Sequence, residues 1–134
     1  MKAIGAMLIA LALGGCANLQ SLACPAGQTS LRTAQLFFGR SIGDTPAVSE
    51  AAFRAFVDQE ISPRFPDGLT VLDGGGQWRG PENKLIREAS KVVMIVLPKG
   101  RGATDRIEAV RDAYKAGFHQ DSVLLVTETA CVSF

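Results

Sequence analysis

The sequence is poor in the residues that most often build metal sites and catalytic centres. It has one histidine, His119, and three cysteines among 134 residues. A zinc site usually takes four cysteine, histidine or carboxylate ligands, which this chain does not supply in a recognisable pattern. Ser122 and Asp121 follow the histidine, but sequence neighbours rarely form a Ser-His-Asp triad. We expect no metal and no cofactor, and interpret His119 as an exposed residue at a helix end.

An excess of charge of one sign is also lacking. The chain has 14 basic and 13 acidic residues, and Lys2 is the only charged residue among the first 15, so the remainder carries 13 of each sign. The basic residues are scattered and form no stripe. A nucleic-acid-binding protein usually gathers them on one face, so we expect no nucleic-acid partner.

No apolar run is long enough to span a bilayer. The first candidate follows Lys2 and covers residues 3–13, which is 11 residues, whereas a transmembrane helix needs about 20. A positive charge, a short apolar stretch and small residues at its end are typical of a secretory signal peptide. We therefore interpret residues 1–15 as a signal peptide.

The end of this segment, Leu13-Gly14-Gly15-Cys16, resembles the lipobox of bacterial lipoproteins. The resemblance implies cleavage before Cys16 and acylation of that cysteine with chains such as palmitate. The acylated cysteine would bind the lipid bilayer. Ala17 in place of aspartate resembles the sorting pattern for the outer membrane, with the protein facing the periplasm. The alternative is an ordinary signal peptide with an incidental cysteine.

Hydrophobic periodicity predicts four strands and two helices after a small, polar tether at 16–32. A long hairpin lies between Arg64 and Pro98, and its second arm ends in six consecutive apolar residues, which is typical of a strand buried on both faces. Ser49 and Thr104 are expected to cap the two helices. The expected elements are a strand at Thr33–Ser41, a helix after Ser49, hairpin arms from Leu69 and from Lys84 to Leu97, a helix after Thr104, and a strand at Val123–Phe134.

Three consecutive glycines, Gly74–Gly76, interrupt the first arm of the hairpin. No Lys-Ser/Thr pair follows them and no helix begins there, so the pattern is not that of a phosphate-binding loop. We predict a β-bulge or a sharp bend instead.

The predicted order β-α-β-β-α-β is that of the ferredoxin-like fold, an α+β domain at 33–134 with a four-stranded antiparallel sheet and both helices on one face. Right-handed crossovers place the first and third strands in the middle. The last strand then ends beside the start of the first. Cys24 lies nine residues before Thr33, so it can reach Cys131, and an exported protein favours such a disulfide over two buried thiols.

Four blocks occur in this order along the chain: Phe65-Pro66-Asp67-Gly68-Leu69-Thr70, Gly76-Gln77-Trp78, Glu88-Ala89-Ser90-Lys91 and Phe118-His119-Gln120-Asp121-Ser122-Val123. Together they resemble a family of small exported bacterial proteins known as Domain of Unknown Function 3574. The resemblance covers most of residues 33–134 and implies the fold and the exported address, but no activity.

A few residues are candidates for binding or catalysis. Glu88 precedes the apolar strand, where a carboxylate near apolar walls can act as a base, although a paired structural glutamate is the alternative. Trp78 and its neighbour Gln77 are candidate ligand-binding residues, and Trp78 is either a stacking wall for a ligand or a cap on the core. Arg40 is a candidate anion contact or an ordinary surface arginine.

Two classes of function remain open from these residues. The first is a non-catalytic envelope module that binds a ligand or partner. The second is a small-molecule enzyme like the dimeric ferredoxin-like monooxygenases and isomerases, with Glu88 as acid or base, which is an analogy of fold alone.

The sheet face without helices is expected to be apolar, and such a face usually marks an interface. We predict that a second copy of the chain covers it, with the segment Ala17–Ser30 as the alternative cover. The residues expected on this face are Thr33, Gln35, Phe37 and Gly39, Val123, Leu125, Thr127 and Thr129, and either Val92, Met94 and Val96 or Val93, Ile95 and Leu97.

Overall fold

The computed structural model describes residues 23–42 and 45–134. The predicted signal peptide and the first part of the predicted tether, residues 16–22 with Cys16, lie outside the described residues. The elements are β1 (Thr29–Gly39), β2 (Ser41–Ile42), β3 (Thr45–Pro46), α1 (Glu50–Phe56), the π-helix η1 (Val57–Ile61), β4 (Thr70–Arg79), the 3₁₀ turn η2 (Pro81–Asn83), β5 (Leu85–Val96), α2 (Ala103–Phe118) and β6 (Leu124–Val132). No helix in this part of the chain is long and apolar enough to cross a membrane.

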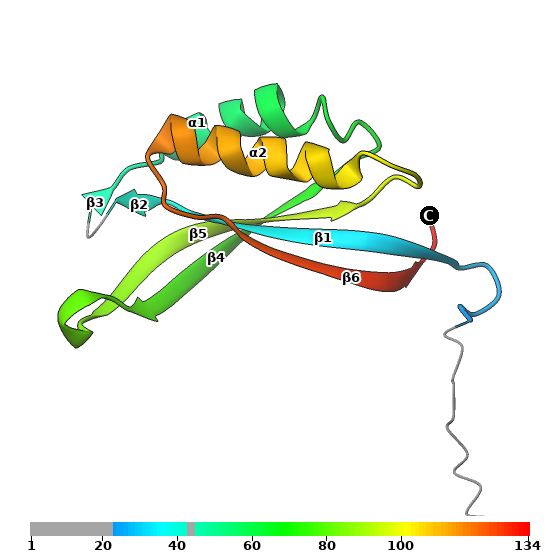
Figure 1. Ribbon diagram of the computed structural model, residues 1–134, viewed down its shortest axis with the longest axis horizontal. Coiled ribbons are helices and arrows are strands. Elements are labelled where there is room, and N and C mark those ends of the chain that lie inside the picture. Colours follow the sequence, from blue (N-terminus) through cyan, green and yellow to red (C-terminus); the bar gives the residue numbers. More distant parts are fainter. Residues whose placement is uncertain (1–22, 43–44) are drawn as a thin grey trace, which may run out of the picture.

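The main sheet has the order β4-β5-β1-β6, and every neighbouring pair is antiparallel. Both helices lie on one face of it, as Figure 1 shows. The predicted ferredoxin-like fold is therefore confirmed, with β1 and β5 in the middle of the sheet. β2 and β3 form a separate two-stranded ribbon after β1, which the sequence pattern did not predict.

The core lies between the helices and the sheet. Alternate residues of the two central strands point into it, because successive side chains of a strand point to opposite faces. Four aromatic rings from β1 and both helices meet edge to face, with centroids 4.7 Å apart for Phe38 and Tyr114 and 5.0 Å apart for Phe56 and Tyr114. The largest fully buried side chains are Tyr114, Phe38, Leu36, Ile61, Ile107, Val93, Val110 and Val123.

The predicted N-cap of the first helix is confirmed, and that of the second helix is wrong. Ser49 caps α1, since its hydroxyl accepts a hydrogen bond of 3.1 Å from the amide of Ala52. The predicted cap at Thr104 is wrong, because α2 begins at Ala103 and its N-cap is Gly102, with φ of 92°. The left-handed conformation suits glycine, and it allows Ala103 to pack into the core.

Two expectations about the strands are also corrected. β1 begins at Thr29, four residues before the predicted start, because its first residues pair with the end of β6, from Thr29 opposite Val132 onward. The glycines Gly74–Gly76 form no bulge, since the pairing of β4 with β5 continues through them without a slip. They belong to a regular strand.

The face of the sheet without helices, called the open face below, differs from expectation on two strands. Phe37 pairs with Leu124, so both point to the open face, whereas Val123 and Leu125 pack toward the core. On β5 the open-face set is Val92, Met94 and Val96. This strand is buried on one face only, because Met94 is 42% exposed.

The β4–β5 hairpin extends beyond the rest of the sheet. The last pair between β1 and β5 is Gly39 with Ser90, whereas the pairing of β4 with β5 continues to Arg79 and Leu85. In Figure 1 this part of the hairpin projects away from the helices, at the end of the sheet opposite the C-terminus. The open face and the projecting hairpin meet at the end of β1.

The predicted disulfide is confirmed. Cys24 is bonded to Cys131, with their Cα atoms 5.4 Å apart and a sequence separation of 107. It lies at the end of the sheet where β1 begins and β6 ends, because Ser30 pairs with Cys131. The disulfide and the projecting hairpin are thus at opposite ends of the sheet.

Candidate functional site

The open face is built of cross-strand rows of contrasting size. One row, called the apolar row below, crosses all four strands and consists of Leu72, Val92, Phe37 and Leu124. The next row toward the projecting hairpin consists of Gly74, Ser90 and Gly39. A Cβ on Gly74 would lie 2.8 Å from the hydroxyl of Ser90, so this row has room only for small residues.

Gly39 and Ser90 of this row, called the small row below, form the floor of a cleft of about 620 Å³, called the sheet-face cleft below. Phe37 and Leu124 of the apolar row line one side of it, and Trp78 lines it on the hairpin. The loop after α2, at residues 119–122, and β2 complete the lining. A second, more open hollow of about 520 Å³ shares Gly75–Gln77 and Glu88 with the cleft but has no aromatic lining.

Trp78 is positioned by the turn of the hairpin. It pairs with Ile86 on the open face, and both side chains pack over Gly80, where a Cβ would lie 2.5 Å from Cδ1 of Ile86 and 3.3 Å from Cζ3 of the indole. Its exposed fraction is 51%, so it does not cap the core. The arrangement leaves a large aromatic surface beside the cleft.

Glu88 lies in the cleft opposite Gly76. Its carboxylate extends over Gly39, where a Cβ would lie 3.1 Å and 3.2 Å from the two oxygens. The side chain is half-buried, and no ion pair or hydrogen bond joins it to another described residue. The carboxylate can lie there because residue 39 has no side chain.

Gln120 brings a further oxygen to the same point. Its amide nitrogen donates to the carbonyl of Ser41 at 2.9 Å and to that of Phe118 at 3.4 Å. This turns Oε1 toward Gly39, where it would lie 3.3 Å from a Cβ. The residue reaches this place because α2 ends in the left-handed His119, with φ of 52°, and the chain turns toward the sheet.

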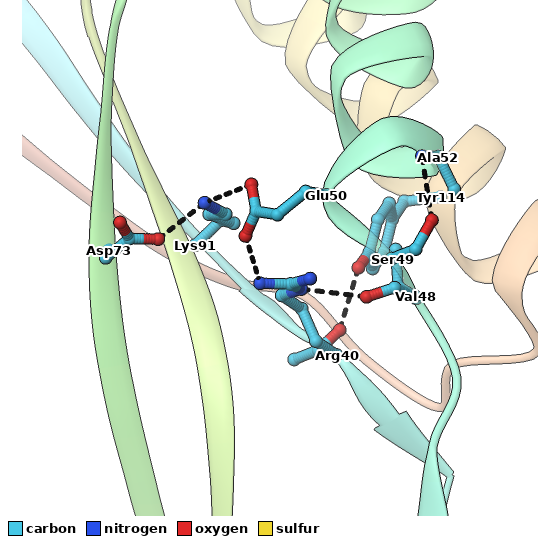
Figure 2. A network of polar contacts seen from close by, with 9 residues as sticks. Arg40, Val48, Ser49, Glu50, Ala52, Asp73, Lys91 and Tyr114 are labelled. Atoms are coloured by element: carbon cyan, nitrogen blue, oxygen red, sulfur yellow. Dashed lines mark hydrogen bonds and ion pairs between the residues drawn. The ribbon is translucent and has the colours of Figure 1, made fainter.

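Arg40 is not part of the cleft lining. Its Nε donates to the carbonyl of Val48 at 2.9 Å, and its Nη1 lies 2.5 Å from the carboxylate of Glu50. Figure 2 shows that Glu50 also contacts Lys91, which in turn reaches Asp73. The hydrogen bonds of Lys91 lower the pKa of both Glu50 and Asp73, and the hydrogen bonds of Asp73 and Glu50 raise that of Lys91.

The floor of the cleft is also tied to α2 from the core side. The hydroxyl of Tyr114 donates to the carbonyl of Gly39 at 2.7 Å. Burial of this phenol raises its pKa to about 12, so the group stays a neutral donor at ordinary pH. The position of Gly39 therefore depends on the core beneath it.

The cleft brings together three of the candidates from the sequence, Glu88, Trp78 and Gln77, and leaves Arg40 outside. His119 is exposed at the rim, at the end of a helix. Within the described residues, no three histidine, cysteine, aspartate or glutamate side chains gather as a metal site requires. Three of the four sequence blocks quoted for the family resemblance contribute to the lining, those that contain Trp78, Glu88 and Gln120.

Gly39 and Gln120 were missed as site residues. Gln120 stands in one of the quoted blocks, and Gly39 ends a strand in which it faces the same side as Phe37. The sequence block and the strand face were the only signals for these residues, and neither indicates that Gly39 and Gln120 lie next to Glu88.

The family model described as "Protein of unknown function (DUF3574)" matches residues 33–134. The chain belongs to this family. No curated protein matches the sequence. Membership of this family assigns no activity to the protein.

Solved structures with a similar fold include two of a phage enzyme. A phage SAM lyase in complex with S-methyl-5′-thioadenosine superposes with a TM-score of 0.59 at 16% identity, covering 84% of this chain and 94% of the lyase chain. The same kind of lyase in the apo state gives a TM-score of 0.59 at 18% identity, covering 78% and 90%. At these identities the likeness concerns the fold.

Proposed function

We propose that this DUF3574 protein is a lipid-anchored module of the bacterial envelope that binds a small molecule in the sheet-face cleft. The observation that carries the proposal is the cleft itself. Small residues form its floor, aromatic and aliphatic side chains line it, and a carboxylate that no described residue pairs with stands inside it. Apolar hollows with a few convergent polar groups are the usual form of small-molecule sites.

The lipid anchor gives the cleft an orientation. Seven residues separate Cys16 from Cys24, so the acylated residue would lie within roughly 28 Å of the disulfide. β1 runs from the disulfide end of the sheet to Gly39, a length of about 33 Å. The anchor would therefore hold the disulfide end near the bilayer and present the cleft to the periplasm.

A catalytic role for Glu88 is the second candidate. The favouring observation is that this carboxylate lies inside the cleft next to apolar surface, where it could transfer a proton to or from a bound molecule. The phage SAM lyase uses a similar fold in an enzyme, which supports this candidate by analogy alone. Turnover of a bound compound that is lost in Glu88→Gln would favour the enzyme over the binding module.

The test of ligand binding uses residues 16–134 with Cys16→Ser, called the non-acylated chain below, and the neutral fluorescent probe N-phenyl-1-naphthylamine. We expect the probe to bind, and Gly76→Leu to weaken binding at least about tenfold because the new side chain fills the cleft beside Glu88. Gly75→Leu is the matched control, since its side chain points to the opposite face. Equal binding by both variants would contradict the proposal.

S-methyl-5′-thioadenosine is a second probe for the same measurement. The phage SAM lyase was solved with it, and its planar base suits the aromatic lining of the cleft. Competition between this compound and the fluorescent probe would extend the ligand class to nucleosides. Mass spectrometry of the protein purified from the envelope would identify a molecule that is bound in the cell.

A further inference from the structure

Three acceptor oxygens converge at one point inside the sheet-face cleft, whose wider lining also includes the hydroxyls of Ser41, Ser90 and Ser122. Both carboxylate oxygens of Glu88 and Oε1 of Gln120 converge on Gly39, at 3.1, 3.2 and 3.3 Å from the position of a Cβ. The amide nitrogen of Gln120 is used by the carbonyls of Ser41 and Phe118 and fixes the direction of its oxygen. A carboxylate and an amide oxygen can only accept hydrogen bonds, so a bound group must donate them.

No lysine or arginine is among the described residues that line the cleft. Arg40 is bound to Val48 and Glu50, and Lys91 lies on the helix-covered face with Asp73 and Glu50. The register also places Arg87 on the face opposite Glu88. The charge of Glu88 is thus not neutralised from within the cleft, and Asp121 adds a second negative charge to its lining.

The apolar part of the cleft limits the shape of the ligand. Phe37 and Leu124 stand on one side of the small row, and Trp78 stands beyond Glu88 on the hairpin. Aromatic surfaces of this kind pack against flat apolar groups. An aromatic body between these residues would direct a short substituent toward Gly39.

We propose that the cleft selects a cationic ligand, in which an ammonium or amidinium group on a flat apolar body donates to Glu88 and Gln120. This inference rests on the proposed function and adds the chemical class of the ligand to it. A charge-assisted hydrogen bond to a carboxylate is stronger than one between neutral groups. An anionic group placed at Gly39 would meet three acceptor oxygens and like charge, and would bind more weakly.

The test compares three compounds that share a phenyl ring on a three-carbon chain and differ in the terminal group: 3-phenylpropan-1-amine, 3-phenylpropan-1-ol and 3-phenylpropionate. Trp78 is the only tryptophan of the chain, so its fluorescence, excited where tyrosine does not absorb, reports binding in the cleft of the non-acylated chain. We expect the amine to bind at least about tenfold more tightly than the alcohol, and the carboxylate to bind more weakly than either.

The matched variants are Glu88→Gln and Glu128→Gln. Glu128 is exposed on the same open face but lies on β6 opposite Thr33, away from the cleft. Glu88→Gln should abolish the preference for the amine while the alcohol binds as before, and Glu128→Gln should leave the preference unchanged. Loss of the preference in both variants equally would overturn the inference, because the effect would then come from net charge.

The outcome also separates this inference from the proposed function. Equal or tighter binding of the alcohol or the carboxylate by the unmodified cleft would overturn the cationic class and leave a ligand-binding cleft. Absence of any change in Trp78 fluorescence with all three compounds and with N-phenyl-1-naphthylamine would overturn both.

Discussion

The ammonium of Lys91 lies 2.8 Å from a carboxylate oxygen of Glu50 and thereby joins the middle of the sheet to the first residue of α1. Lys91 is buried on the helix-facing side of β5, and it also contacts Asp73 of the edge strand at 2.5 Å. A buried ammonium needs such partners, because removing a charge from water is costly unless other groups replace the water. The network holds three elements together next to the floor of the cleft.

The first prediction concerns the pH dependence of this network. The lowered pKa values of Glu50 and Asp73 mean that their contribution to stability is present above the ordinary values of 4.5 and 3.8 and is lost as the pH falls through the lowered values. The raised pKa of Lys91 means that its contribution is present below 10.5 and is lost as the pH rises further. Lys91→Met should make the free energy of unfolding depend less on pH in both the acidic and the alkaline range.

Urea unfolding of the non-acylated chain at a series of pH values measures the effect. We expect the unfolding midpoint of Lys91→Met to change less than that of the parent chain between neutral and acidic pH. Lys99→Met is the control, since Lys99 is exposed in the loop before α2. An equal acid dependence in the parent and Lys91→Met would show that the ion pairs add no stability.

The second prediction concerns Tyr114, whose hydroxyl donates to Gly39 beneath the cleft. Tyr114→Phe leaves that carbonyl without its partner, and we expect a loss of about 1 kcal/mol in the free energy of unfolding at neutral pH. Burial raises the pKa of Tyr114 to about 12, so its contribution is present below 10 and is lost as the pH rises from 10 toward 12. The difference between the two chains should therefore shrink at alkaline pH, and a constant difference would contradict it.

The order of the elements could be predicted because each element repeats its apolar residues with its own period. Alternation in β1 separates Ala34, Leu36 and Phe38 from the open face, and the spacing of Phe53, Phe56 and Ile61 marks a helical stripe. The chain order of these elements then leaves one plausible arrangement of the sheet. The disulfide followed, because that arrangement brings the two ends of the domain together.

The sequence could not predict which side chains of β6 point toward the core, because both faces of the strand are apolar where it begins. Val123 and Leu125 on one side are no more apolar than Leu124 and Val126 on the other, so alternation gives no preference. The pairing of Phe37 with Leu124 decides it. A one-residue difference in register moves every side chain of the strand to the other face.

The candidate site was predictable only in part for a similar reason. Glu88 and Trp78 could be predicted because a glutamate can transfer protons and a tryptophan can stack on a ligand. Gly39 contributes only by having no side chain, which leaves room for Glu88 and Gln120. Its role depends on β5 continuing past the end of β1 and on the turn at His119 that brings Gln120 to it. Contacts between such distant segments leave no periodic signal.

The third prediction concerns the Cys24–Cys131 disulfide, which closes a loop of 107 residues. The chain-entropy model assigns roughly 4–5 kcal/mol to a loop of this size. Cys24→Ser, Cys131→Ser and the double variant should each lose a similar amount in the free energy of unfolding, because each removes the same bond. Guanidinium unfolding measures it, and losses that add up in the double variant would argue against a shared bond.

The fourth prediction is that Cys16 is acylated and that the protein fractionates with membranes. More than one acyl chain gives stable anchoring, whereas a single chain is marginal. Cys16→Ser should either release the protein to the soluble fraction or block its processing. Metabolic labelling with a fatty acid checks the modification directly, and absence of label from the parent chain would refute the anchor.

The last prediction is that a second copy of the chain packs on the apolar row of the open face, beside the sheet-face cleft. The apolar row crosses all four strands; its outer side chains are exposed, with values of 46% for Leu72 and 59% for Leu124, and Phe37 and Val92 between them are half-buried. An exposed row of this extent usually marks an interface. A second copy is the occupant that suits it, because the row carries no charge and can pack against itself about a twofold axis, as most dimer interfaces do.

Light scattering on the non-acylated chain at micromolar concentration checks this prediction. We expect a dimer, and Leu124→Glu should convert it to a monomer because the carboxylate would be buried in the interface. Thr127→Glu is the matched control, since Thr127 is exposed on the same strand but faces the other side of the sheet. A monomeric parent chain whose first residues resist protease would show instead that the segment Ala17–Ser30 covers the face.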